Sequence, residues 1–243
     1  MRLTDFDVLT FDIIGTLIDF ESGVLNWVRP RVLRVKPEAT DQEMLEAYAR
    51  AQSAVRKAEP KLSFSGRASK IWAGIAKEYG IAVQPHDGAA FLASARNWPA
   101  FPDSVEALAY LKRNYRHLVG VTNGDRVSAR AMAQTLGSPF FAVITEEDMG
   151  VSKPDPKAFE YFLGYLAKLG VPKERVLHVA QSQYHDIGTA RKIGLASTWV
   201  YRRHGKSGYG GTQTPPEFTQ PDFLVTSLAG LVALHEEDLR ATA

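Results

Sequence analysis

Short apolar runs alternate with segments of helical pattern along most of the chain. Five runs have the length and composition of buried strands, and each stops at a polar residue in a turn-prone stretch: residues 8–11, 118–122, 176–180, 198–201 and 223–225. Apolar residues recur at helical spacing in 103–112, 126–136, 156–169 and 186–193. Strands that alternate with helices predict an α/β fold, a doubly wound parallel sheet with helices on both faces.

Residues 21–98 interrupt this alternation. They contain no strand pattern, and their apolar spacing predicts helices at 22–33, 41–57 and 65–79. An all-helical insertion directly after the first strand predicts a cap domain over the carboxyl edge of the sheet, where open α/β sheets bind ligands. We therefore expect two domains, a core of residues 1–20 and 99–243 and a cap of residues 21–98, with 98–102 as the return hinge.

Composition removes several classes of function. The 243 residues are 45% apolar and 23% charged, which is ordinary for a globular protein with one large core. A net charge of +2 without a basic block argues against nucleic-acid binding, and no apolar stretch approaches the ~20 residues that span a bilayer. The absence of cysteine excludes thiol nucleophiles and disulfides. The acidic N-terminal stretch does not resemble a signal peptide, so we expect a cytoplasmic enzyme without membrane contact.

Polar residues with chemical potential follow the predicted strands. Asp12 ends the first strand and opens a glycine-permitted turn, so its carboxylate is presented rather than buried in the sheet. Thr122 and Asn123 follow the second strand, and the segment 181–186, which ends in Asp186, follows the third. Lys153 lies in the sequence Ser-Lys-Pro-Asp-Pro, directly before a predicted helix. The glycine-rich segment 204–211 lacks the upstream glycine of a P-loop and predicts a mobile surface loop.

With these four loops in order and the helical insertion after the first, the chain resembles the haloacid dehalogenase superfamily of hydrolases over essentially its whole length. The resemblance is closer to type II 2-haloacid dehalogenases and to related metal-independent enzymes, such as those that open the ring of azetidine-2-carboxylate. It implies that Asp12 is the nucleophile and forms an ester that water then cleaves. It also implies that Lys153 keeps this carboxylate ionised and that Asp186 orients Lys153 or helps to activate the water.

The resemblance also implies a set of substrate-binding groups. Thr122 and Asn123 are expected to hold an anionic group of the substrate together with the backbone N–H groups of Ile13 and Ile14. The remaining expected contacts are Thr16, which supports the loop, and Ser182, Gln183 and Arg50. Arg50 is the cap residue that corresponds to the halide-binding arginine of dehalogenases, with a solvated helix residue as the alternative. Plain structural roles also remain open, a turn for Thr122 and Asn123 and a helix N-cap for Asp186.

Some positions depart from the dehalogenase pattern. Ile14 and Phe159 stand where those enzymes usually have tyrosine, and Gln183 stands where asparagine is usual. His185 is open to an acid–base or a structural role. Trp27, Trp72 and Trp98 either wall an apolar pocket or pack between cap and core. The leaving group is therefore not fixed by the sequence.

Electrostatics favour a carboxylic acid over a phosphate ester as the substrate. A phosphate brings up to two negative charges toward Asp12, and each contact at ~4 Å costs about 4 kcal/mol at an effective dielectric near 20. Phosphatases of the superfamily offset this repulsion with Mg²⁺ and protonate the leaving group with an acid two residues after the nucleophile. Here Ile14 occupies that position, and Gln181 replaces a usual acidic metal ligand. A 2-haloacid is a monoanion whose halide leaves without a proton.

The sequence therefore predicts a metal-independent, cofactor-free hydrolase that uses Asp12 for covalent displacement at C2 of a short substituted carboxylic acid. A Mg²⁺-dependent phosphatase using Asp12 and Asp186 is one alternative, and a non-catalytic binding protein of the same fold is another. The expected partner is this small acid, and apolar helices exposed on the cap would favour a homodimer.

Overall fold

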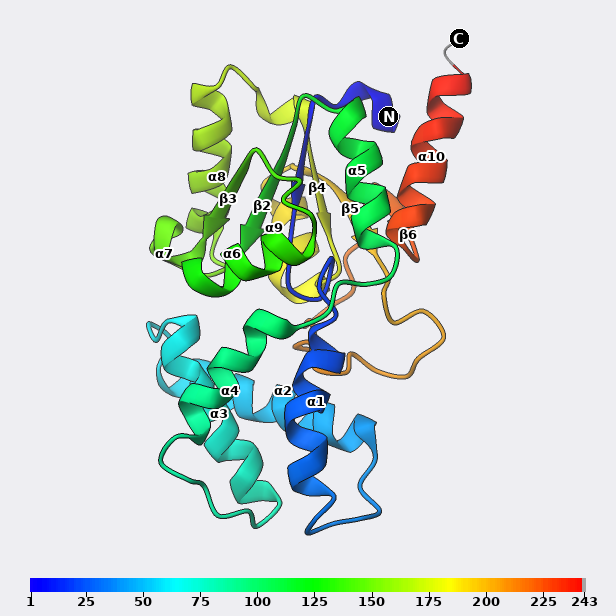
Figure 1. The fold of residues 1–243 in the computed structure, drawn as a ribbon. Coiled ribbons are helices and arrows are strands. Elements are labelled where there is room, and N and C mark those ends of the chain that lie inside the picture. Colours follow the sequence, from blue (N-terminus) through cyan, green and yellow to red (C-terminus); the bar gives the residue numbers. More distant parts are fainter. Residues whose placement is uncertain (242–243) are drawn as a thin grey trace.

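The computed structural model describes residues 1–241 and contains a six-stranded parallel sheet with the strand order β3-β2-β1-β4-β5-β6 (Figure 1). The strands are β1 (Val8–Phe11), β2 (His117–Thr122), β3 (Ala142–Thr145), β4 (Val176–Ala180), β5 (Ala196–Val200) and β6 (Phe223–Val225). β1 lies at the centre, paired in register with β2 from Val8 opposite His117 and with β4 from Val8 opposite Val176. The predicted doubly wound sheet is confirmed.

The helices complete the two layers of the core and form the cap. Those of the core are α5 (Ser104–Asn114), α6 (Arg126–Thr135), α7 (Glu146–Met149), α8 (Pro156–Lys168), α9 (Gly188–Lys192) and α10 (Leu228–Arg240). Those of the cap are α1 (Phe20–Val32), α2 (Asp41–Ala58), α3 (Phe64–Glu78) and α4 (Asp87–Ser94). Short helical turns lie at η1 (Leu3–Asp5), η2 (Ala95–Asn97), η3 (Lys173–Arg175) and η4 (Gln183–Ile187), the last of them π-helical.

Alternation along the central strand divides the core into two apolar clusters. Successive side chains of a strand point to opposite faces of the sheet. Leu9 and Phe11 accordingly pack in the cluster that includes α5, α6 and α10, whereas Val8 packs in the cluster that includes α8 and α9. All three side chains are fully buried. Because both faces of the sheet are buried, the sequences of these strands are continuous apolar runs.

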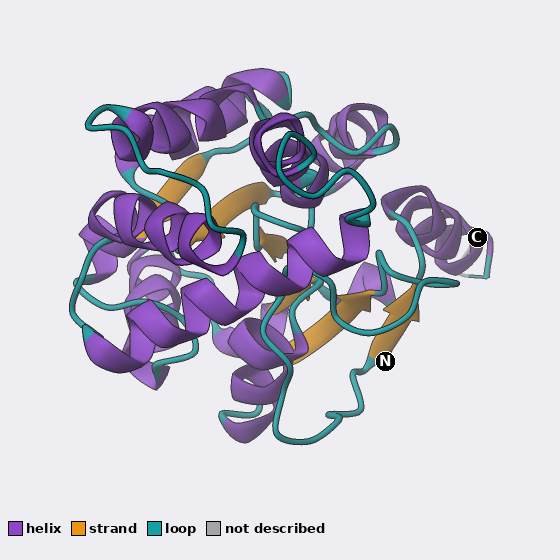
Figure 2. Ribbon diagram, turned by 90° about the horizontal axis from the view of Figure 1, so that it is seen from below, coloured by secondary structure: helices purple, strands orange, loops and turns teal. Residues whose placement is uncertain are grey.

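The cap lies against the carboxyl ends of the strands, as Figure 1 shows, and its helices cross in front of the sheet edge in the view of Figure 2. Gly23 permits the close approach of α1 to the hinge, since an added Cβ would lie 2.1 Å from Trp98 Cδ1. Apolar side chains of the cap helices, among them Met44, Ile75 and Trp72, are buried in the same cluster as Leu9 and Phe11. The prediction that the cap helices expose an apolar face is therefore wrong, and the homodimer stays an untested prediction.

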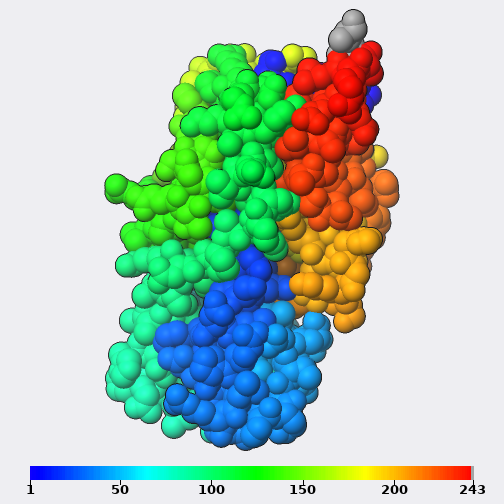
Figure 3. Space-filling view, turned by 45° about the vertical axis from the view of Figure 1, so that its right-hand side comes forward, coloured from blue at the N-terminus to red at the C-terminus, as the bar shows by residue number. Residues whose placement is uncertain are grey.

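The loop between β5 and β6 differs from its expected form. Its glycines 205 and 208 are exposed, but Gly210, Gly211 and Thr212 are buried. The Arg203 guanidinium holds the loop by donating to the carbonyls of Ser207 and Gly208, and it pairs with Glu21 of α1 at 2.6 Å. In Figure 3 this segment lies directly against the cap. The loop is thus part of the boundary between core and cap.

Four of the helices and strands, β3, α4, α7 and α10, were not expected from the sequence. β3 is only four residues long and its first two residues are half-buried, so its apolar run is weak. α4 has a short alanine-rich sequence that includes Gly88, and α10 follows the last strand without a distinctive pattern. Among residues 1–241, no helix combines the length and apolar character needed to cross a bilayer.

Candidate active site

The turn after β1 places Asp12 at the sheet edge that faces the cap. Asp12 N–H still donates to Val179 O at 3.0 Å, so its backbone is fixed to the neighbouring strand β4. Gly15 adopts a φ of 92°, a region that favours glycine, and its N–H donates to Ile18 O at 2.8 Å. Thr16 Oγ1 donates to Asp12 Oδ2 at 2.7 Å and accepts from Gln181 N at 2.8 Å. Thr16 therefore supports the turn, as its predicted role requires.

Lys153 connects the two carboxylates of the site. Its Nζ donates to Asp12 Oδ1 at 2.9 Å, to Asp186 Oδ1 at 2.6 Å and to Val121 O at 2.9 Å. Asn123 positions the lysine backbone through two reciprocal bonds, one from Lys153 N to Asn123 Oδ1 and one from Asn123 Nδ2 to Lys153 O, both at 2.8 Å. The sequence prediction that brings Asp12, Lys153 and Asp186 together agrees with this geometry.

A buried chain of hydrogen bonds extends behind Asp186. His178 Nε2 lies 2.9 Å from Asp186 Oδ1, and His178 Nδ1 lies 2.8 Å from Thr10 Oγ1. The ring of His178 packs on Phe159, the position at which dehalogenases usually have tyrosine. Asp186 Oδ1 thus has two partners, whereas Asp186 Oδ2 is buried and has no hydrogen-bond partner among the described residues. That oxygen is available to a ligand or a water molecule.

Burial and charge shift the pKa values of these groups in different directions. Burial raises the pKa of Asp12, and Lys153 opposes this shift without cancelling it. Burial lowers the pKa of Lys153, but the charges of Asp12 and Asp186 outweigh it and raise the value. Burial raises the pKa of Asp186, but Lys153 and His178 reverse the shift and hold the value at about 2. Lys153 is therefore an ammonium, and Asp186 is a carboxylate at neutral pH.

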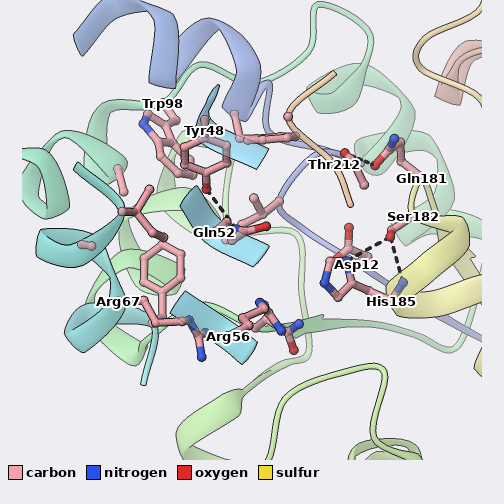
Figure 4. A pocket seen from close by; sticks show the side chains of 18 of the residues that line it. Asp12, Tyr48, Gln52, Arg56, Arg67, Trp98, Gln181, Ser182, His185 and Thr212 are labelled. Atoms are coloured by element: carbon pink, nitrogen blue, oxygen red, sulfur yellow. Dashed lines mark hydrogen bonds between the residues drawn. The ribbon is translucent and has the colours of Figure 1, made fainter. Parts of the chain in front are cut away.

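Asp12 and Asp186 line a pocket of about 840 Å³ between core and cap, part of which is open to solvent (Figure 4). The core contributes polar groups from the loops after β1, β2 and β4, including Asn123, Ser182 and His185. The β5–β6 loop contributes Gly211 and Thr212, although the sequence predicted only a surface loop there. The helices of the cap contribute a mostly apolar wall. The cap therefore shapes one side of the pocket and the strand ends shape the other.

Two cap cations that the sequence analysis did not select line this pocket. Figure 4 shows Arg56 and Arg67 on the cap side, across from Asp12 and His185. Arg67 is neutralised, since its Nη2 donates to Glu146 at 2.9 Å and its Nη1 donates to Leu62 O. Arg56 Nε is buried without a hydrogen-bond partner among the described residues. Burial and, secondly, the charge of Arg67 lower the pKa of Arg56 to about 10, so it is still a cation at neutral pH.

Arg50, the predicted cap arginine, lies outside the pocket. Its guanidinium is exposed and pairs with Glu78 at 2.6 Å, so the solvated alternative agrees with its position. A helix turns 100° per residue, and the spacing of four from Tyr48 through Gln52 to Arg56 keeps those three residues on one face. All three line the pocket. This spacing was the available signal for Arg56.

Several predicted substrate contacts have other partners. Thr122 is fully buried and its Oγ1 accepts from Gly124 N at 3.1 Å, while the side chain of Ile13 belongs to the apolar core. Gln183 is buried and holds the backbone of Thr219 through two bonds. Ile14, Asn123 and Ser182 do line the pocket. Substrate binding by the backbone N–H groups of Ile13 and Ile14 stays a prediction.

His185 lines the pocket as a neutral imidazole. Its Nδ1 lies 3.0 Å from Ser182 Oγ, and its Nε2 is buried without a partner among the described residues. Burial and the cation Arg56 lower the pKa of His185 to about 3. Trp98 also lines the pocket, whereas Trp27 and Trp72 pack edge to face at 6.0 Å inside the cap.

The carboxylates of the site already contact a cation. Asp12 and Asp186 each give one oxygen to the ammonium of Lys153, and Gln181 Oε1 accepts from Thr212 at 3.3 Å. Among residues 1–241, no cluster of three or more His, Cys, Asp or Glu side chains has the arrangement of a metal site. Mg²⁺ is commonly held by one or two carboxylates together with waters and substrate oxygens, so a metal ion here would have to share Asp12 and Asp186 with Lys153.

Comparison with known families agrees with this constellation. The sequence profile of the haloacid dehalogenase-like hydrolases matches residues 6–194, which include Asp12, Lys153 and Asp186. The chain belongs to this family. Solved structures with the same fold include L-2-haloacid dehalogenase from Xanthobacter autotrophicus with chloropropionic acid covalently bound, at 20% identity and a TM-score of 0.76, covering 98% of this chain and 100% of that one. Magnesium-bound YfnB from Bacillus subtilis has 19% identity, a TM-score of 0.73 and coverage of 97% and 99%.

Several curated relatives of this haloacid dehalogenase-like chain carry phosphatase names. Phosphoserine phosphatase of Thermus thermophilus is 30% identical over 115 residues, 46% of this chain and 45% of that protein. YigB of Escherichia coli, a 5-amino-6-(5-phospho-D-ribitylamino)uracil phosphatase, is 28% identical over 237 residues, 93% of this chain and 94% of YigB. The chain spans about half the length of the phosphoserine phosphatase. The reaction must therefore be argued from the residues of the site.

Proposed function

We propose that this hydrolase uses Asp12 to displace a leaving group, such as a halide, from C2 of a substituted carboxylic acid without a metal ion. The observation that carries the proposal is the buried Lys153 ammonium, which lies within 2.9 Å of both carboxylates and supplies the positive charge at the nucleophile. The fold of the structurally similar L-2-haloacid dehalogenases supports the same reaction class.

In the first step, Asp12 attacks C2, a carbon–oxygen bond forms, and the bond to the halide breaks with its electron pair. Ile14 lines the pocket beside Asp12 and has no proton to donate, and a halide needs none. The cation Arg56 faces this space and stabilises the departing anion. Arg56 thereby takes the role that the sequence analysis gave to Arg50.

In the second step, water attacks the carboxyl carbon of the Asp12 ester. The bond from that carbon to the former Asp12 oxygen that is attached to C2 breaks, and the product leaves as a 2-hydroxy acid whose hydroxyl takes one proton of the water while the other proton passes to solvent. Asp186 Oδ2 has no partner among the described residues and lies at the pocket, where it orients this water. Lys153 and Thr16 each donate to one oxygen of Asp12 and stabilise the carboxylate when it is released.

Chloride release from 2-chloropropionate tests this proposal. We expect release at the same rate with a chelator and with added Mg²⁺, and none from Asp12→Asn. In ¹⁸O-water, mass spectrometry should find the label in the Asp12 carboxylate after a single turnover, because water attacks that carbon. Label found only in the product hydroxyl would instead show direct attack of water on C2 and contradict the proposal.

A Mg²⁺-dependent phosphatase is the second candidate, favoured by the names of the curated relatives. It requires Asp12 and Asp186 to exchange their Lys153 contacts for a metal ion. A panel of phosphate monoesters assayed with and without Mg²⁺ separates the two reactions. Metal-dependent phosphate release without chloride release would replace the first proposal by the second.

A further inference from the structure

We infer that the preferred substrate carries an apolar substituent larger than methyl at C2, which the cap wall binds. This inference rests on the proposed function, because it places C2 of the acid at Asp12. It concerns the part of the pocket that the displacement reaction itself does not use.

The apolar wall is continuous over two cap helices and the turn after them. Ala68 and Ile71 come from α3, Phe91 and Leu92 from α4, and Ala95 from η2. All but Leu92 are buried, and all five line the pocket. Polar lining groups concentrate at the sheet edge, and the polar side chains that the cap helices add are Tyr48, Gln52, Arg56 and Arg67. An acid bound with its reacting end at the sheet edge therefore directs its substituent toward an apolar surface.

The size of the pocket exceeds the demands of a methyl substituent. The pocket of about 840 Å³ includes space that is open to solvent, and the part that can hold the centre of a water molecule is about 80 Å³, which is room for several waters or methylene groups. A 2-halopropionate places one methyl group against this wall and leaves the rest to water. Each further methylene buried there gains free energy, equivalent to about fourfold in affinity or in kcat/KM.

The first test is a series of 2-chloropropionate, 2-chlorobutanoate and 2-chlorohexanoate. We expect kcat/KM to rise about fourfold per added methylene, or ~60-fold from the first acid to the last. A flat or falling series would overturn the inference while leaving the proposed reaction intact, since chloride would still be released.

The second test replaces small residues of the wall by leucine, which fills part of the pocket. Ala95→Leu and, as an independent site, Ala68→Leu should remove most of the advantage in kcat/KM of the six-carbon acid over 2-chloropropionate. Ala93→Leu is the matched control, because Ala93 is exposed on α4 and does not line the pocket. Equal loss for both acids in the two filled variants would contradict a substituent pocket.

Binding of unreactive acids separates this inference from the chemistry. Calorimetric titration with propionate and hexanoate measures how tightly the wall binds an alkyl chain, without any displacement step. Tighter binding of hexanoate, reversed by Ala95→Leu, supports the substituent pocket even if none of the chlorinated acids is turned over, a result that would refute only the proposed reaction. Equal or weaker binding of hexanoate would overturn the inference.

Discussion

At the scale of single residues, Arg56 and Arg50 differ in what surrounds them although both belong to α2. The Nε of Arg56 is buried without a partner beside the pocket, whereas Arg50 is exposed and paired with Glu78. A buried N–H group without an acceptor is costly, and an anion in the pocket that accepted from it would offset this cost. The structure therefore provides a matched pair of arginines.

Replacing each arginine by methionine tests this difference. We expect Arg56→Met to lower kcat/KM for 2-chloropropionate by about 100-fold, because the leaving anion loses its cation in a buried site. Arg50→Met should change kcat/KM by less than about twofold. The folded state of Arg56→Met should not be weakened, since Arg67 no longer faces a like charge. Similar activities of the two variants would show that Arg56 takes no part in the reaction.

The pH dependence of the reaction follows from the shifted pKa of Asp12. Burial raises this pKa above its usual 3.8, so Asp12 takes up a proton at a higher pH than an exposed aspartate does. Only the carboxylate attacks, and kcat/KM should therefore fall as the pH is lowered, with a midpoint above 3.8. The raised pKa of Lys153 predicts no matching loss between pH 8 and 10. A pH profile of kcat/KM, with circular dichroism to show that the protein stays folded, tests both the expected fall at low pH and the expected absence of a loss at high pH.

The sequence predicted the positions of the core residues of the site better than those of the cap residues. Asp12, Lys153 and Asp186 lie directly after strands or before a helix, so their positions follow from the order of elements in the chain. Thr122 and Gln183 do not line the pocket, because hydrogen bonds to Gly124 and Thr219 decide where those side chains point, and their binding of substrate stays a prediction. Such contacts depend on how loops meet in space, which a single sequence does not specify.

At the scale of elements, two ion pairs join core and cap on separate segments. Glu146 of α7 accepts from Arg67 of α3, from Phe64 N and from Ser152 Oγ, and Arg203 of the β5–β6 loop pairs with Glu21 of α1. The Arg67–Glu146 side chains are only 4% and 6% exposed. Since buried pairs lose more than exposed ones when one partner is removed, Glu146 is the sharper test of this contact.

Glu146→Gln should lower the free energy of unfolding by about 3 kcal/mol or more, because Arg67 is left buried without its counter-charge. Glu78→Gln is the control, with an expected loss below about 1 kcal/mol for an exposed pair. Urea denaturation of both variants measures the difference. Equal losses would show that the Arg67–Glu146 contact does not hold the cap in place.

The element pattern shows where prediction from the sequence is strong. Strands β1, β4 and β6 have the predicted bounds, and the ends of the cap helices α1 to α3 lie within two residues of the prediction. Continuous apolar runs and helical spacing produce clear signals because both faces of the central strands are buried. The edge strand β3 is half-covered at its start, and α4 is short, so each lacks the pattern that burial imposes.

At the scale of the whole molecule, the site exists only where three separate parts of the chain meet. Strand ends supply the charged groups, the cap supplies the apolar wall, and the β5–β6 loop supplies Gly211 and Thr212. The sequence indicated the first two parts, because strands and amphipathic helices are periodic. It did not indicate the third, since contacts such as that of Arg203 with Glu21 join residues far apart in the sequence.

Trp98 gives this arrangement an optical consequence. The indole lines the pocket, packs on Phe20 at 6.3 Å between ring centroids and has a buried Nε1 without a partner among the described residues. Any acid that enters the pocket changes the polarity around this ring, so its intrinsic fluorescence reports occupancy directly. Stopped-flow recordings of that emission would then resolve substrate entry, ester formation and product departure as successive phases without an attached dye.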